Sequence, residues 1–235
     1  MKKHIPNFIT LLNLSSGVIA IWIAMHNELK LAAIMVIVAA VFDFFDGFSA
    51  RLLHVKTNIG KELDSLSDVV YFGVAPAIIV SQLYAKIYGL SIDNLGLNIM
   101  ILCFPIIYVC CASLRLAKFN LDSEQTEHFK GLPTPAAAFV LISLPFFEMN
   151  KYTTIVLSGI LLLLSVLMVS KLYLFSLKFQ NLKLKDNLFR YILIIIGGIL
   201  LSVFLLKAIP FIILMYILLS IIENQYSKKF NIKKI

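Results

Sequence analysis

Four aspartates stand close together in an otherwise apolar part of the sequence, and their spacing suits shared chemistry. Asp43 and Asp46 are three residues apart, and Asp64 and Asp68 are four apart. On a helix, residues at these spacings share one face, so each pair would point in one direction. The stretch 43–68 reads DFFDGFSARLLHVKTNIGKELDSLSD. It predicts two helices that aim two carboxylates each at one point.

Small residues accompany both pairs of aspartates. Gly47 and Ala50 share the face of the first pair, and Gly60 stands four residues before Asp64. A helix face that carries almost no side chain lets a ligand or a neighbouring helix approach closely. We therefore expect either a bound ligand or a close helix contact beside the carboxylates.

The charge of the four carboxylates allows three interpretations. Packed together, they repel by about 4 kcal/mol per close pair at an effective dielectric constant of about 20. Divalent cations remove this repulsion, and all-oxygen ligation selects hard ions such as Mg²⁺ or Mn²⁺. Acids inside a membrane also mark proton or cation pathways, and Arg51 or Lys61 offer ion pairs across helices. The residues alone leave metal-assisted chemistry, transport and structural pairing open.

The composition indicates a membrane protein. Of the 235 residues, 60% are hydrophobic and 14% are charged, against about 25% charged residues in a soluble domain. Apolar runs recur along nearly the whole chain, and a helix needs about 20 such residues to span a bilayer. We predict an all-α polytopic membrane protein with about eight transmembrane helices. The predicted spans are 8–26, 30–53, 61–85, 97–118, 134–149, 153–173, 189–206 and 208–224.

The hydrophobic runs follow one another so closely that no segment between them is long enough to fold alone. We therefore predict a single membrane-embedded domain over residues 1–235. The first residues lead straight into a span and lack the small-residue cleavage site of a signal peptide. The segment 174–188 alternates Leu or Phe with Lys, so it is predicted to be either an amphipathic stretch along the membrane interface or a solvated basic loop.

Basic residues are distributed unequally between two sets of loops. The net charge is +8, and 17 of the 21 Lys and Arg residues flank the two termini and the loops after the second, fourth and sixth spans. Cytoplasmic loops carry an excess of Lys and Arg, so both termini and the aspartates are predicted on the cytoplasmic side of the cell (inner) membrane. Scattered basic residues suit an anionic lipid leaflet, and we expect no nucleic-acid partner.

The fixed positions in 43–68 read D-x2-D-G-x2-A-R-x8-G-x3-D-x3-D, and all eight specified residues are present. This pattern resembles the signature of the CDP-alcohol phosphatidyltransferase family. A weaker resemblance to the serine-using bacterial branch of that family extends from the N-terminus to about residue 140. It is carried by HIPNFITLLNLSSG at 4–17, FDFFDG at 42–47, LDSLSD at 63–68, SLRLAKFN at 113–120 and FKGLPTPAAA at 129–138.

The resemblance implies a phospholipid-synthesis enzyme that transfers the phosphatidyl group of CDP-diacylglycerol to L-serine. A family-like core would cover about 4–173, with two further spans in 189–224, and the protein would be a homodimer among membrane lipids. A two-metal site for Mg²⁺ or Mn²⁺ would be held by the four motif aspartates, of which Asp68 would also be the general base. The residues implied to contact CDP-diacylglycerol are Asn7, Thr10, Gly47, Arg51 and Thr57.

The acceptor is less constrained than the donor. A basic side chain near the site would select the carboxylate of serine. The candidates are Arg115, Lys118 and Lys130, with Asn120 as a polar partner. The alternatives are the same chemistry with glycerol 3-phosphate or inositol phosphate and, from another class, a divalent-cation or proton-coupled transporter. A transporter is expected to show acids in several spans and inverted repeats, whereas the acids here lie in two predicted spans.

Overall fold

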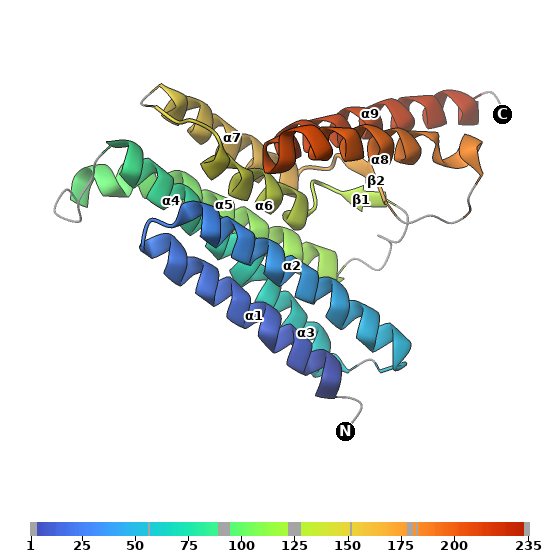
Figure 1. Cartoon of the computed structure of the whole chain (residues 1–235). Coiled ribbons are helices and arrows are strands. Elements are labelled where there is room, and N and C mark those ends of the chain that lie inside the picture. The colour runs from blue at the N-terminus through green and yellow to red at the C-terminus, as the bar shows by residue number, and fades with distance from the viewer. Residues whose placement is uncertain are drawn as a thin grey trace.

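The computed structural model describes residues 4–55, 57–88, 95–121, 128–150, 152–177, 181 and 183–232. The chain begins with a helical hairpin of α1 (His4–Met25) and α2 (Leu29–Leu52), which lie side by side (Figure 1). The turn between them contains Asn27 with a φ of 64°, a conformation that asparagine adopts more readily than most residues. Small residues let the two backbones approach closely and gain van der Waals contact. The buried alanines of this hairpin are Ala20, Ala24, Ala32, Ala33 and Ala39.

The third helical stretch changes its geometry partway along. It begins as α3 (Asn58–Asp68), passes through a π-helical segment at Val69–Val74 and continues as α4 (Ala75–Tyr88). Thr57 caps its start, since its Oγ1 accepts a hydrogen bond from the N–H of Gly60 at 3.0 Å. A π-helical turn closes i→i+5 hydrogen bonds and holds more residues than an α-helical turn. The helix faces that a regular α-helical period predicts for this stretch therefore apply only as far as Asp68.

The second half of the chain packs across the first. Its helices are α5 (Leu95–Leu121), α6 (Thr134–Ser143), α7 (Thr153–Val169), α8 (Leu184–Phe204) and α9 (Ile209–Ile232). Two short strands, β1 (His128–Lys130) and β2 (Tyr173–Phe175), pair antiparallel with Phe129 opposite Leu174. In Figure 1, α5 lies along the α1–α4 bundle, while α8 and α9 form a separate hairpin with the strands beneath it.

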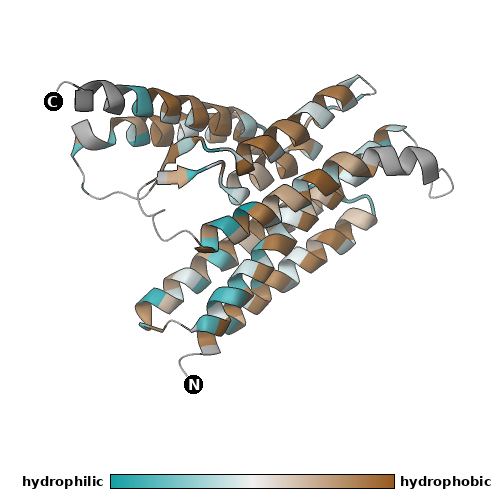
Figure 2. Ribbon diagram, turned by 180° about the vertical axis from the view of Figure 1, so that it is seen from behind, coloured by the Kyte–Doolittle hydropathy of each residue, from teal (hydrophilic) through white to brown (hydrophobic). Residues whose placement is uncertain are grey.

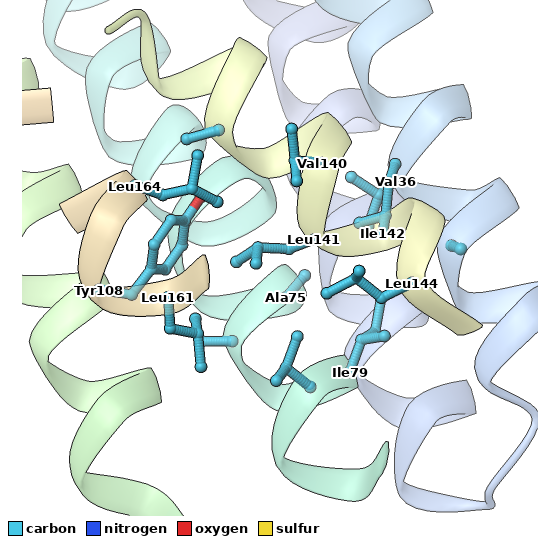
Figure 3. Close-up of a cluster of buried hydrophobic side chains, with 14 of the residues drawn as sticks. Val36, Ala75, Ile79, Tyr108, Val140, Leu141, Ile142, Leu144, Leu161 and Leu164 are labelled. Atoms are coloured by element: carbon cyan, nitrogen blue, oxygen red, sulfur yellow. The ribbon is translucent and has the colours of Figure 1, made fainter. Parts of the chain in front are cut away.

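The apolar core joins these two parts around α6. Leu141 and Ile142 of this helix are almost fully buried, and α6 contacts α2, α4, α7 and α9. Figure 3 shows the side chains that converge on it from four other helices. They are Val36 of α2, Ala75 and Ile79 of α4, Tyr108 of α5, and Leu161 and Leu164 of α7. This packing fixes α4 and α5 relative to one another.

Many large apolar side chains are exposed on the surface, and hydrophobic residues run along much of the long helices in Figure 2. Among the described residues, five helical stretches are long and apolar enough to cross a membrane. They are Ile5–Met25, Leu29–Leu52, Asn58–Tyr88, Leu102–Leu121 and Asn187–Gln225, the last of which contains both α8 and α9. Thr134–Phe146 and Thr153–Val169 are shorter apolar helices. The all-α polytopic membrane fold is thus confirmed, and the number of eight crossings stays a prediction.

Candidate active site

Three of the four predicted carboxylates meet at one point. Asp43 of α2 and both Asp64 and Asp68 of α3 each offer an oxygen, and these oxygens lie within 4.8 Å of one another. The two helices pack mainly on α1, not on each other. The aspartates therefore face a space between α2 and α3 that α1 closes from one side.

The fourth carboxylate is held by α1. Thr10 Oγ1 donates a hydrogen bond of 2.7 Å to Asp46 Oδ2, and both residues are buried. A hydrogen bond to a charged group contributes about 1.5–3 kcal/mol. Asp46 lines the same cavity as Asp64, so it lies beside the other three carboxylates with its orientation set by Thr10.

A cavity of about 480 Å³ opens next to the carboxylates, within the range of ligand pockets. Its lining residues come from α1, the end of α2, the α2–α3 connection and α3. They include Asn7, Thr10, Asp46, Gly47, Ala50, Thr57, Gly60 and Asp64. Four of the five residues implied for CDP-diacylglycerol, namely Asn7, Thr10, Gly47 and Thr57, therefore line one cavity. The fifth, Arg51, is exposed and does not line the cavity, and its Nε donates to the carbonyl of Gly47 at 3.0 Å.

The two motif glycines have different local roles. A Cβ at Gly47 would meet nothing within 4 Å, so this residue leaves open space in the cavity wall. A Cβ at Gly60 would lie 2.9 Å from Thr57 Oγ1 and 3.1 Å from Asn7 Oδ1. Gly60 therefore permits the close approach of α1 to the start of α3, which places Asn7 at the cavity.

Basic residues do not neutralise the carboxylates. Lys61 Nζ donates to the carbonyl of Asn120 at 3.2 Å, and Arg51 is bonded to Gly47. Across the described ranges, no salt bridge involves any of the four aspartates. The pairing interpretation is thus not supported for Arg51 or Lys61. A set of carboxylate oxygens that forms no ion pair among the described residues fits a hard divalent ion.

The predicted acceptor residues separate into two groups. Arg115 of α5 is 7% exposed, and its guanidinium carbon lies 4.9 Å from the Phe119 ring centroid. Its positive charge favours the ionised form of the Asp68 carboxyl group. Asn120 Nδ2 donates to Ser65 Oγ at 2.6 Å, next to Asp64. These two residues approach the carboxylates from α5. In contrast, Lys118 is exposed, and Lys130 lies in β1.

Two residues that the sequence did not single out lie against this site. The hydroxyl of Tyr71 donates to Asp68 Oδ1 at 2.5 Å. Asn13 of α1 is fully buried, and within the described part of the chain neither its amide nitrogen nor its amide oxygen has a hydrogen-bond partner. Asn13 stands three residues after Thr10, which is the helical spacing that could have pointed to it. Tyr71 likewise stands three residues after Asp68, and the same spacing could have pointed to it.

Comparison with known proteins matches the chain to one family. A family model described as CDP-alcohol phosphatidyltransferase matches residues 3–222. The chain is 36% identical over 170 residues to the CDP-diacylglycerol–serine O-phosphatidyltransferase of Bacillus subtilis, covering 72% of this chain and 89% of that protein. A protein of the same name from Helicobacter pylori (strain J99) is 33% identical over 227 residues, or 93% and 90% of the two chains.

An archaeal relative shows a similar level of identity. The archaetidylserine synthase of Methanothermobacter thermautotrophicus is 37% identical over 174 residues, covering 72% of this chain and 68% of that protein. Both the motif aspartates and the cavity beside them lie within the segment that the family model matches. The chain belongs to the CDP-alcohol phosphatidyltransferase family.

Proposed function

We propose that the protein transfers the phosphatidyl group of CDP-diacylglycerol to L-serine and releases CMP. The observation that carries this proposal is the convergence of Asp43, Asp64 and Asp68 beside a cavity of ligand size. The names of the bacterial relatives support serine as the acceptor. The serine hydroxyl oxygen bonds to the phosphorus that carries diacylglycerol, and the bond from that phosphorus to the oxygen of CMP breaks.

The carboxylates have two tasks in this proposal. Asp43, Asp46, Asp64 and Asp68 hold two divalent cations, Mg²⁺ or Mn²⁺, for which their oxygen-only donor set is suited. Bound cations of this kind stabilise the attacking and leaving oxygens of an in-line displacement. Asp68 takes the proton of the serine hydroxyl as the general base. Thr10 keeps Asp46 oriented through the 2.7 Å hydrogen bond.

The donor and the acceptor occupy opposite sides of the carboxylates. Asn7, Thr10, Gly47 and Thr57 contact the CDP group from the cavity wall, and Arg51 contacts the diphosphate. The open space at Gly47 supports this placement, because any larger side chain would occupy the cavity.

Serine approaches from the side of α5 in this proposal. Arg115 binds its carboxylate, since a guanidinium has the fork geometry for bidentate recognition and Arg115 is buried on α5. Asn120 is a polar partner for serine, while Lys118 and Lys130 contribute positive charge in the predicted cytoplasmic region between the fourth and fifth spans.

The proposed setting is the inner membrane, with both termini and the site on the cytoplasmic side and with a second copy as a homodimer partner. The asymmetry of 17 basic residues out of 21 supports the orientation. A cysteine introduced at position 2 or 234 is expected to resist an impermeant thiol reagent in intact cells. Labelling at either position would contradict the orientation and would leave the chemistry unaffected.

A direct test of the function uses purified protein with CDP-diacylglycerol and a panel of radiolabelled alcohols. We expect the label of serine to enter lipid together with stoichiometric release of CMP. Preferred use of glycerol 3-phosphate or inositol phosphate would contradict serine as the acceptor, while the proposed phosphatidyl transfer would stand. Release of no CMP with any alcohol would overturn the proposed function.

A further inference from the structure

Tyr71 is in direct contact with the proposed base, and the motif assigns it no role. Its hydroxyl donates to Asp68 Oδ1 at 2.5 Å, a distance typical of a hydrogen bond to an ionised carboxylate. The side chain is fully buried, in a small apolar cluster with Ala39, Phe72 and Ala138. A buried tyrosine hydroxyl needs a partner, and here that partner is a residue of the catalytic site.

Two features of the fold fix the position of this hydroxyl. Tyr71 lies in the π-helical segment Val69–Val74, which begins directly after Asp68. On the other side, α1 presents Gly17, where a Cβ would lie only 2.7 Å from the Cβ of Tyr71. A side chain at position 17 would thus displace Tyr71. The buried amide of Asn13, one helical turn before Gly17, also lies beside the tyrosine.

From this geometry we propose that Tyr71 is a positioning residue for Asp68, an inference that rests on the proposed role of Asp68 as the base. The hydroxyl of Tyr71 holds Oδ1, which fixes the rotation of the carboxylate and leaves Oδ2 for the proton of the acceptor. The terminal torsion of an aspartate is otherwise broad. A general base must lie within hydrogen-bond reach of the proton that it removes.

The structure supplies a matched control on the same continuous helix. Tyr84 of α4 is also buried, and its hydroxyl is 2.7 Å from Ser158 Oγ. It is remote in sequence from the aspartates and contacts none of them. Tyr84→Phe removes a buried tyrosine hydroxyl of the same kind, so it reports the structural cost of such a loss without any effect on Asp68.

The experiment compares full-length Tyr71→Phe and Tyr84→Phe with wild type in detergent or lipid nanodiscs. We expect Tyr71→Phe to lower kcat by about 10- to 100-fold, because small misplacements of reacting groups have effects of this size. KM for both substrates, and binding of CDP-diacylglycerol measured without acceptor, should stay within about twofold. Both variants should lower the melting temperature by similar amounts, and Tyr84→Phe should keep the wild-type kcat.

A second variant tests the same inference with the hydroxyl still present. Gly17→Ala should displace Tyr71 and lower kcat, again with little change in KM. Wild-type kcat in both Tyr71→Phe and Gly17→Ala would overturn the positioning role, as would equal losses of kcat in Tyr71→Phe and Tyr84→Phe. If Asp68→Asn abolishes turnover while Tyr71→Phe keeps the wild-type kcat, the positioning role fails and the proposed function stands.

Discussion

The two ends of the α1–α4 bundle each contain a cavity, and they differ in how the charged side chains are held. At the carboxylate end, Asp46 and Asp68 are fixed by hydrogen bonds from Thr10 and Tyr71. At the opposite end, a cavity of about 670 Å³ is lined by residues of the α1–α2 turn and the end of α4. Its charged residues Glu28, Lys30 and Lys86 are exposed and, among the described residues, form no ion pairs.

The comparison shows that cavity size is a poor guide to chemistry in this fold. The larger cavity has exposed charged side chains, whereas the smaller one lies beside buried or half-buried carboxylates, two of which accept hydrogen bonds from Thr10 and Tyr71. Acids inside a membrane protein are costly, by about 2.5–3.5 kcal/mol each at the bilayer centre and less toward the interface, so we infer that a bound ligand offsets the cost of this cluster. We therefore assign the chemistry to the smaller cavity and predict different sensitivities at the two ends.

The largest effect is expected for Asp68→Asn. Loss of a general base lowers the rate by about 10²–10⁴-fold, while three carboxylates remain to bind metal weakly. Turnover should fall far more than binding of CDP-diacylglycerol. Glu28→Gln at the opposite cavity is the control, and a rate for Asp68→Asn above about a tenth of wild type would remove Asp68 from this role.

The hydrogen bond from α1 should have the next largest effect. Thr10→Val keeps the shape of the side chain but leaves the buried carboxylate of Asp46 without its donor, which costs about 1–3 kcal/mol. We expect the concentration of Mg²⁺ needed for half-maximal rate to rise by about 10-fold. Ser16→Ala is the control, because the one hydrogen bond of this buried hydroxyl among the described residues is to the carbonyl of Leu12. If Thr10→Val leaves the Mg²⁺ requirement unchanged, the proposed role of Asp46 in metal binding is wrong.

A smaller and more selective effect is expected at Arg115. Lysine cannot grip a carboxylate bidentately, so Arg115→Lys should raise KM for serine several-fold and leave KM for CDP-diacylglycerol nearly unchanged. Serinamide, which lacks the carboxylate, should be a poor acceptor for wild type and nearly as good as serine for the variant. Equal use of the two acceptors by wild type would exclude the carboxylate contact.

The smallest effect is expected at the opposite cavity. Lys30→Gln combined with Lys86→Gln removes both basic side chains from its wall. Because these residues are exposed and form no ion pair among the described residues, we expect less than a twofold change in kcat and in both KM values. A tenfold loss of activity with an unchanged melting temperature would show that the two ends are not functionally distinct.

The sequence predicted helices in all eight segments, since long apolar runs dominate each of them. It also predicted the shared faces of the aspartates, because the spacing of three and four residues falls on regular helices before the π-helical segment. The structure confirms the all-α fold and brings Asp43, Asp64 and Asp68 together. The position of Asp46 depends on Thr10, which is 36 residues away, and helix periodicity contains no information on such a contact.

The features that sequence reasoning missed depend on tertiary packing. Tyr71 donates to Asp68 from within a π-helical segment, and an apolar run gives no sign of such a change in helix type. The strand β2 overlaps the end of the predicted span 153–173, whose helix ends at Val169, and the start of 174–188, predicted to be an amphipathic stretch or a basic loop. Its three residues pair with β1 from a distant part of the chain. A strand of that length has too few residues for an alternating pattern to be recognised.

Binding of Mn²⁺ to the purified protein, followed by electron paramagnetic resonance without substrates, tests the central claim most directly. The account predicts that wild type binds Mn²⁺ and that Asp43→Asn combined with Asp64→Asn abolishes this binding, because both carboxylates belong to the cluster of three. The Lys30→Gln, Lys86→Gln variant should bind like wild type, and exhaustive chelation should abolish turnover until Mg²⁺ or Mn²⁺ is restored. Unchanged Mn²⁺ binding in the double aspartate variant, or full turnover after chelation, would contradict the account.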